Sequence, residues 1–425
     1  MDIPRELLAA CVAAPADDGP RHVWADAVGG ERGELVAVQL RLASGEGTPA
    51  EVGALLARQR ALLTAHGVAW SGLAGTGVTT VRFGRGFVDA IAIDARALAD
   101  RGEAIAAAAP LCHGLALTGL HVAGSAPATE ALVEELLVGW GARPLTALQL
   151  APHGFDMGGG RPSRTPTPAF TEAAIATLAR RGVLRGLASL TMSHVDRAVD
   201  ELLRSNQIAQ LTRLTISARD PGAVRALVRG LPRLEAFAVP RGIPVPDVVD
   251  ALSATVRELT LPLEVGASYD LDPGLHALAA SRLGPGLETL RLGGGRLRLD
   301  ASAVARLPRL ASLDLGAVIL WDEAQASFLA CELPALRSLR LMDHGRDDPV
   351  PAAFHTAVAT RFGARLDALM IAGDRVFGPP TVEPLRPLVA GDVHAARTAE
   401  PWIDPSPPPR APAWEHATVV LPGPA

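Results

Sequence analysis

The stretch LPRLASLDLG at residues 307–316 returns with small changes at two other places, as LPALRSLRLM at 333–342 and as LPRLEAFAVP at 231–240. In each copy a proline, which ends a helix, stands just before a run in which apolar residues alternate with others. Alternation of this kind is typical of a strand with one face against a core. The three copies therefore predict one small unit, in which a helix ends in a turn and leads into a strand, used several times in the chain.

The centre of this unit is the motif L-x-x-L-x-L, which occurs ten times from residue 117 onward, with other apolar residues replacing leucine in some copies. The copies begin at residues 117, 145, 187, 211, 234, 256, 287, 310, 336 and 366. Between them lie patterns such as VDRAVDELLRSN at 195–206, in which apolar residues recur three or four apart as in an amphipathic helix. One strand and one helix cannot bury both apolar faces alone, so we expect the units to stack with their strands in one parallel sheet.

Most copies are spaced close to the period of about 20 to 29 residues typical of leucine-rich repeats, and the chain resembles the leucine-rich repeat family over about residues 110–375. The resemblance implies an α/β fold, a leucine-rich-repeat-like solenoid with the parallel sheet on the concave face and helices on the convex face. A small all-α module is expected to precede it. The family usually carries an Asn or Cys after the third leucine, which hydrogen-bonds along adjacent loops. Asn206 is the only Asn in this chain, so we expect irregular loops and uneven curvature.

Residues 1–72 lack the repeat and are expected to form the helical module. Its helices are expected at 4–13, 20–42 with a possible break at Gly29 and Gly30, and 50–66. The segments ADD, WAD, RGE and HGVAW occur here in an order that resembles the bacterial repeat-companion domain, which is found ahead of leucine-rich-like repeats. This resemblance implies an architecture and no activity. Five charged residues could bind a partner, or could cap helices and pair within the module: Asp17, Asp18, Asp26, Arg32 and Glu34.

Two further segments border the repeats. VTTVRFGRGFVDAIAID at 78–94 alternates like two strands joined at GRG, and a hairpin there would cover the exposed end of the first repeat. DPSPPPRAP at 404–412 cannot sustain a helix or a sheet, although Trp402, Trp414 and the following ATVVL could dock back on the body. The expected domains are the module at 1–72, the hairpin with the repeats at 73–376, and a Pro-rich C-terminal tail at 377–425.

Composition excludes several classes of function. The 425 residues carry a formal net charge of −5, and all 40 basic residues are Arg, so no Schiff-base or phosphate-loop lysine can exist. Scattered Arg and an aromatic content of 4% argue against a nucleic-acid partner. The most apolar stretch, 104–124, is interrupted by Pro110, His113 and His121 and does not predict a membrane span. Three widely separated cysteines are no disulfide framework and indicate a reducing cytoplasm.

No arrangement of residues indicates catalysis. The candidate nucleophiles are Ser125 near His121, Cys112 beside His113, and Ser193 in SHVD at 193–196. None has the G-x-S-x-G context of an exposed nucleophile. The acidic and histidine residues of MDHGRDD at 342–348 lack the spacing of metal ligands. We therefore expect no enzyme activity, no cofactor and no metal site.

The surface of the sheet remains as a place for function. Side chains alternate along a strand, so the leucines of each motif point into the core while its third and fifth residues point outward across the concave face. This face is most charged between Glu258 and Arg340, and we predict a partner-binding site made of Glu258, Arg291, Asp314 and Arg340. Arg and Asp on neighbouring strands could equally pair with each other.

These features together predict a non-catalytic protein-binding or scaffold protein, with a protein as its partner. The alternative is a regulator or proteolytic substrate of an enzyme in a bacterial signalling or defence system, in which the Pro-rich C-terminal segment is processed. Limited proteolysis separates the two, because a single cut beyond residue 377 that changes partner binding would favour the alternative.

Overall fold

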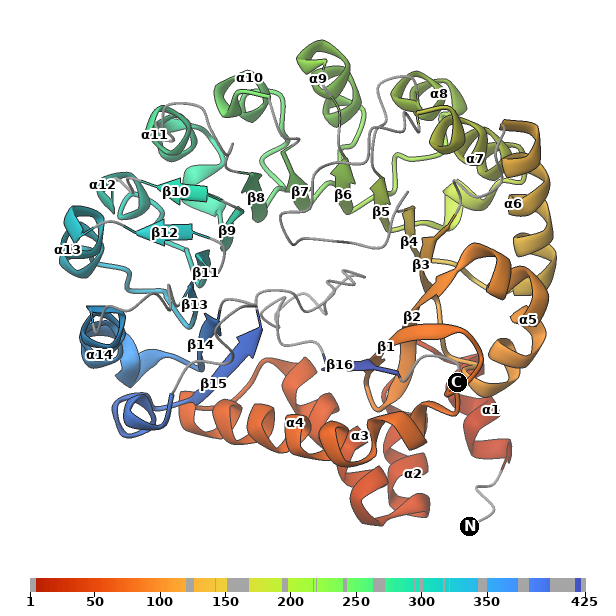
Figure 1. Cartoon of the computed structure of the whole chain (residues 1–425), viewed down its shortest axis with the longest axis horizontal. Coiled ribbons are helices and arrows are strands. Elements are labelled where there is room, and N and C mark those ends of the chain that lie inside the picture. The colour runs from red at the N-terminus through yellow and green to blue at the C-terminus, as the bar shows by residue number, and fades with distance from the viewer. Residues whose placement is uncertain are drawn as a thin grey trace.

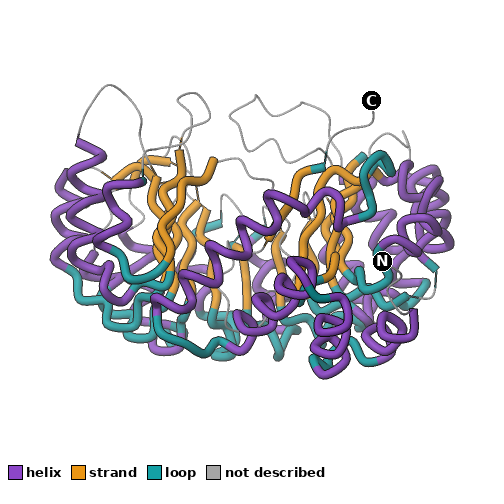
Figure 2. The backbone as a smooth tube through the Cα atoms, turned by 90° about the horizontal axis from the view of Figure 1, so that it is seen from below, coloured by secondary structure: helices purple, strands orange, loops and turns teal. Residues whose placement is uncertain are grey.

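The computed structural model of the chain is a closed ring with strands on the inside and helices on the outside (Figure 1). It describes residues 5–119, 126–141, 143–150, 168–192, 198–216, 218, 220–239, 243–262, 272–293, 295–297, 301–315, 318–320, 322–342, 350–373, 382–397 and 417–421. Figure 2 shows the strands standing side by side within the layer of helices. The predicted solenoid, with its parallel sheet on the concave face and helices on the convex face, is confirmed.

Fourteen of the described strands form one sheet. The strands are β1 (Val78–Gly84), β2 (Phe87–Asp94), β3 (Gly114–Thr118), β4 (Ala147–Leu150), β5 (Ser189–Met192), β6 (Arg213–Ile216), β7 (Ala236–Ala238), β8 (Glu258–Pro262), β9 (Thr289–Gly293), β10 (Gly295–Leu297), β11 (Ser312–Leu315), β12 (Val318–Leu320), β13 (Ser338–Met342), β14 (Ala368–Gly373), β15 (Asp392–Arg397) and β16 (Ala417–Val420). Their order is β15-β14-β13-β11-β9-β8-β7-β6-β5-β4-β3-β2-β1-β16, with β10 and β12 paired separately. Neighbours from β2 to β15 are parallel, whereas β1 pairs antiparallel with both β2 and β16.

The register of the sheet explains the repeated motif. Leu313 of β11 is the register partner of Leu290 on β9 and of Leu339 on β13, and all three side chains are fully buried. Equivalent leucines thus stack around the ring in one continuous core. Because parallel strands lie about 4.8 Å apart, the third and fifth residues of successive motifs form two rows on the inner face.

Helices cover the outside of the sheet. They are α1 (Arg5–Ala13), α2 (Gly19–Val28), α3 (Gly30–Ser44), α4 (Pro49–Ser71), α5 (Ala95–Ala108), α6 (Ala126–Trp140), α7 (Pro168–Arg180), α8 (Ala198–Ser205), α9 (Pro221–Arg229), α10 (Val245–Val249), α11 (Asp272–Ala280), α12 (Ala301–Val304), α13 (Asp322–Ala330) and α14 (Val350–Phe362). Short 3-10 helices are η2 (Val183–Gly186), η3 (Gly284–Gly286), η4 (Gly363–Arg365) and η5 (Glu383–Leu388). From α5 onward each helix returns the chain from the end of one strand to the start of the next, as stacked strand-and-helix units require.

The N-terminal segment forms four helices rather than three. The pattern expected to be one helix at 20–42 is divided into α2 and α3 at Gly29, whose φ of 61° is a left-handed conformation that glycine adopts without strain. Helix α4 begins with a capping box, in which the Thr48 hydroxyl accepts from the Glu51 amide and the Glu51 carboxylate accepts from the Thr48 amide. It continues to Ser71, past the expected end at residue 66.

Helix α4 closes the ring between the two edges of the sheet (Figure 1). Gly53 packs so tightly on β15 that a β-carbon there would lie 2.4 Å from the backbone nitrogen of Asp392. Further along the helix, a β-carbon on Gly67 would lie 2.5 Å from Cγ2 of Val419 on β16. Arg60, between these glycines, pairs with the Asp392 carboxylate. An open solenoid ends in exposed strand edges, whereas here the edge strands β15 and β16 both pack against α4.

Two parts of the sheet differ from the expectation. Leu115 and Leu117 are the register partners of Leu148 and Leu150, so the first unit begins at Cys112 and the start predicted at residue 117 is wrong. The apolar alternation in LALTGLHV fits both frames, which explains the error.

The segment 377–425, expected as a tail, contributes both edge strands. β15 continues the parallel sheet beside β14, and its motif AGDVHA at 390–395 escaped detection because small residues replace the leucines. β16 is the segment predicted to dock back, and it pairs with β1 of the predicted hairpin. Trp402 and Trp414 lie outside the described residues.

Candidate functional site

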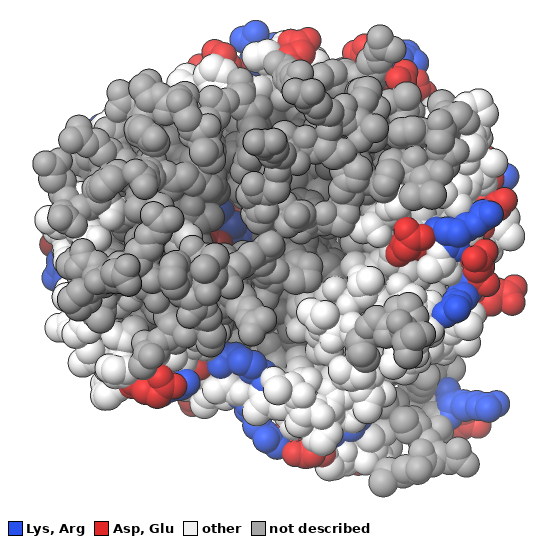
Figure 3. All heavy atoms as spheres, in the orientation of Figure 1, with Lys and Arg blue, Asp and Glu red and all other residues white. Residues whose placement is uncertain are grey.

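Two rows of side chains line the inner face of the ring. The third-position row is Gly114, Ala147, Ser189, Arg213, Ala236, Glu258, Thr289, Ser312, Ser338, Ala368 and Asp392. The fifth-position row is Ala116, Gln149, Thr191, Thr215, Ala238, Thr260, Arg291, Asp314, Arg340, Met370 and His394. Most members are small or uncharged, and Figure 3 shows basic and acidic atoms inside the hollow at the centre of the ring.

Glu258 on β8 is the centre of the larger ion-pair group. Its carboxylate accepts a hydrogen bond from the Arg213 guanidinium on β6 at 2.8 Å and lies 2.6 Å from the Arg291 guanidinium on β9. Arg213 reaches it across β7, whose inner-face residues Ala236 and Ala238 leave the necessary room. Burial raises the pKa of Glu258, but the charges of Arg291 and Arg213 outweigh this effect, and its pKa lies below the ordinary value. The carboxylate is therefore ionised at neutral pH.

Asp314 on β11 and Arg340 on β13 form a neighbouring pair. They are register partners, and Oδ2 of Asp314 lies 3.6 Å from Nη1 of Arg340. Their side chains are 16% and 15% exposed, compared with 7% for Arg291. The structure thus places all four predicted residues on one arc of the inner face. Together with Arg213, which the motif also turns outward but which was not among the predicted site residues, they are called the inner charged cluster.

A separate charged group lies where the ring closes. Asp392 of β15 is buried, pairs with Arg60 of α4, and lies 3.2 Å from Nδ1 of His394. Burial raises the pKa of Asp392, but its hydrogen bonds with His394 and Arg60 and the charge of Arg60 lower it by more. Sequence reasoning missed this contact because Arg60 and Asp392 are 332 residues apart.

No family model matches the chain, and no curated protein matches it. Similar solved structures include the leucine-rich repeat-containing protein LegL7 from Legionella pneumophila, with 14% identity, a TM-score of 0.41, and coverage of 65% of this chain and 89% of that chain. An internalin from Listeria monocytogenes has 12% identity, a TM-score of 0.28, and coverage of 72% and 86%. The chain has a leucine-rich-repeat-like fold. What sets this solenoid apart from an open one is the closure by α4.

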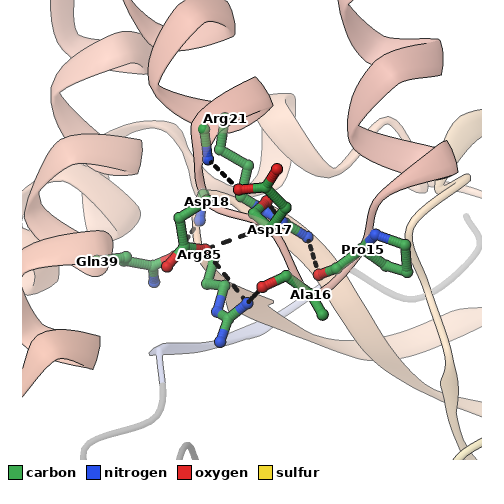
Figure 4. A network of polar contacts seen from close by, with 9 residues as sticks. Pro15, Ala16, Asp17, Asp18, Arg21, Gln39 and Arg85 are labelled. Atoms are coloured by element: carbon green, nitrogen blue, oxygen red, sulfur yellow. Dashed lines mark hydrogen bonds and ion pairs between the residues drawn. The ribbon is translucent and has the colours of Figure 1, made fainter.

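The ADD segment of the N-terminal module, residues 16–18, contacts the β1–β2 turn of the solenoid (Figure 4). Arg21 donates to the carbonyl oxygens of Pro15 and Asp17 at 2.9 and 2.7 Å. Asp18 lies 3.2 Å from Arg85, a residue of the turn. These residues were expected either to bind a partner or to cap helices and pair within the module. Asp18 pairs within the chain, and the bonds from Arg21 hold the loop that contains Asp17.

Glu34 is also engaged inside the module. It accepts hydrogen bonds of 2.7 and 2.6 Å from Arg58 of α4, and this bonding lowers its pKa. Asp26 is exposed. The resemblance of residues 1–72 to the repeat-companion domain stays a prediction.

Among the residues considered for catalysis, Cys112 is unsuited to act as a nucleophile. It is buried, and this burial raises the pKa of its thiol to about 12, so hardly any thiolate forms at neutral pH. The described residues contain no group of three or more His, Cys, Asp or Glu side chains placed to hold a metal ion. His121, Ser125, the SHVD segment and residues 343–348 lie outside the described residues. In the described part of the chain no helix is both long and apolar enough to cross a bilayer.

Proposed function

We propose that the protein is a non-catalytic scaffold that binds a protein partner on the inner face of its ring. The inner charged cluster is the observation that supports this function. The leucine positions supply the core, so folding makes little demand on the third and fifth residues, and most of these are Ala, Ser or Thr. From β6 to β13 the face instead presents five charges of alternating sign, in the order Arg213, Glu258, Arg291, Asp314 and Arg340.

The stability of the fold does not explain why these charges are present. Partly buried ion pairs lose hydration that their attraction only just repays, and apolar residues of similar volume often serve as well. Charges of both signs in a fixed order do, however, select a partner with the complementary order and repel others. We therefore assign the cluster to recognition of a folded or extended protein segment that carries both acidic and basic groups.

Pairing divides the cluster into two roles. Asp314 and Arg340 pair at the longer distance of 3.6 Å and are expected to touch the partner. Arg291 and Arg213 hold Glu258 in place, and Arg291 is nearly buried. Arg340 should therefore be the anchor, with Arg291 acting mainly through the position of Glu258.

The test begins with co-purification from native cells and mass spectrometry to identify the partner. Its affinity for Arg340→Ala and Asp314→Ala is then measured by calorimetry beside Arg306→Ala, an exposed control on the outer side. Loss of an Arg anchor typically costs more than about 1 kcal/mol, or roughly a fivefold loss of affinity. If all three variants bind like the parent protein, the inner face is not the site.

The proposal extends to location and to the alternative function. Three free, buried cysteines are compatible with a reducing cytoplasm. The alternative is a processed C-terminal segment at 377–425, of which residues 398–416, between β15 and β16, lie outside the described residues. Limited proteolysis of the full chain addresses it, because a single cut beyond residue 377 that changes affinity for the partner would favour a regulated or processed protein.

A further inference from the structure

Arg32 of α3 is surrounded by four aromatic rings. Its guanidinium carbon lies 5.5 Å from the ring centre of Trp24, 5.1 Å from Trp70, 5.7 Å from Phe83 and 5.8 Å from Phe87. These rings come from α2, α4 and the two strands of the hairpin, so the cage exists only when the module is docked on the sheet. All four distances are within the range in which a cation is attracted by the ring face.

No counter-ion accompanies this charge among the described residues. Burial alone lowers the pKa of Arg32, to about 10, and no nearby carboxylate offsets it. Its Nη1 atom is buried and has no hydrogen-bond partner among the residues that the structure describes. Other arginines of this region differ, since Arg82 makes hydrogen bonds of 2.7 and 2.6 Å to Asp89 and Arg58 makes two to Glu34.

A guanidinium without a counter-ion lowers the stability of the folded protein at such a position. Burying an ionised group without a partner is strongly unfavourable, and a methionine would fill an aromatic cage without that penalty. Nε1 of Trp24 is also buried without an acceptor in the part of the chain that the structure describes. What the guanidinium lacks is an acceptor that carries negative charge.

The geometry leaves a route for such an acceptor. Nη1 is the only nitrogen of Arg32 that is buried without a partner, and the residue as a whole keeps partial exposure. The Nε–Nη2 edge therefore reaches the surface. This edge is one of those on which a carboxylate binds with two parallel hydrogen bonds.

We propose that Arg32 and its aromatic cage form a binding site for a carboxylate attached to an apolar group. A single guanidinium neutralises one charge, which suits a carboxylate, whereas a phosphate dianion needs further donors and cations. Glu31 and Glu34 flank Arg32 in the sequence and would repel a dianion. Trp24, Phe83 and Phe87 are buried, whereas Trp70 is partly exposed, so its ring is the one that favours ligand carbon atoms next to the carboxylate. This site lies on the N-terminal module and does not depend on the proposed inner-face function.

Tryptophan fluorescence offers a direct readout, because Trp24 and Trp70 border the site. The full-length protein is titrated with sodium isovalerate, sodium acetate and sodium phosphate at constant ionic strength. We expect a saturable response to both carboxylates, with isovalerate binding at least about fourfold more tightly than acetate, the gain that one buried methylene gives. Phosphate should bind more weakly than either.

Two variants and one control locate the response. Arg32→Met removes the charge and fits an aromatic cage, while Arg32→Lys keeps the charge but lacks the planar fork, and should weaken binding about tenfold. Arg58→Met removes an arginine of the same module that already has a partner, and should bind like the parent. The proposal is overturned if neither carboxylate gives a saturable response, if the response survives unchanged in both Arg32 variants, or if phosphate binds more tightly than isovalerate.

Discussion

Replacing Glu258 by Gln should destabilise the protein strongly. The substitution keeps the shape of the side chain and removes the negative charge that Arg213 and Arg291 share, whose side chains are 16% and 7% exposed. Removing one partner of a buried ion pair typically costs about 3–5 kcal/mol, because the remaining charge loses its compensation while staying out of water. Since Arg213 retains some exposure, we expect the free energy of unfolding to fall by about 3 kcal/mol at pH 7.

The same group should make stability depend on pH. The pKa of Glu258 is lower in the folded chain than the value of about 4.3 expected in the unfolded chain. Its contribution is therefore fully present above the unfolded value and is lost as the pH falls through the folded value. Because Gln does not titrate, the gap in stability between the parent protein and Glu258→Gln should narrow below about pH 4.

Glu288→Gln is the matched control. Glu288 pairs with Arg257 at 3.0 Å, but these side chains are 43% and 50% exposed, so the loss should not exceed about 1 kcal/mol. Urea unfolding followed by circular dichroism, at pH 7 and pH 3, measures both variants. Equal losses for Glu258→Gln and Glu288→Gln at pH 7 would refute the reasoning that the inner charged cluster is a buried, coupled group.

Two other predictions test the face assignment and the cysteines. Leu313→Asp should lower the melting temperature severely, since Leu313 is fully buried and the new carboxylate would have no partner. Asp314→Ala removes one partner of an ion pair whose side chains are 16% and 15% exposed, and should lower the melting temperature by clearly less, because it puts no new charge into the core. Similar melting temperatures would contradict the register. Cys112 should resist iodoacetamide at pH 8 in the native protein, because burial raises its pKa to about 12, and should react after unfolding. The labelling of Cys112 is followed by mass spectrometry. Rapid labelling in the native protein would contradict the prediction and show that this region opens.

The sequence predicts the solenoid well because the spacing of its leucines specifies both the strands and their register. Leu290, Leu313 and Leu339 each mark a strand and also its register, since a shift of one residue would turn them out of the core. The same rule failed at residue 117, because the apolar alternation in LALTGLHV fits two possible starts of the motif. It also missed β15, whose Val393 is the sole large aliphatic residue between small neighbours.

Long-range contacts were beyond the reach of the sequence pattern. Gly53 and Gly67 lie in a helical stretch, and only the folded structure shows that each permits close approach of an edge strand. The motif segments WAD, RGE and HGVAW were recognised individually. That Trp24, Arg32 and Trp70 meet in one cage depends on how three helices pack, which spacing along the chain does not specify.

For the inner face, the motif predicted which residues point outward but not how they pair. Neighbouring register suggested a row of Arg291, Asp314 and Arg340. The structure adds that Arg291 pairs with Glu258, and that Arg213 reaches the same carboxylate across a strand. Such reach depends on the small size of Ala236, a detail that matters only once the strands are side by side.

Closure of the ring by α4 is tested most directly by amide hydrogen exchange of β15. Gly53→Val would force the helix away from the backbone at Asp392, whereas Ala54→Val adds the same side chain at the exposed neighbouring position. We predict that the amides of Asp392–Arg397 exchange at least about tenfold faster in Gly53→Val than in the parent protein, which corresponds to about 1.4 kcal/mol of lost local stability. In Ala54→Val they should exchange as in the parent, and the amides of β7 should be unchanged in both variants. Parent-like exchange of β15 in Gly53→Val would contradict the closed ring.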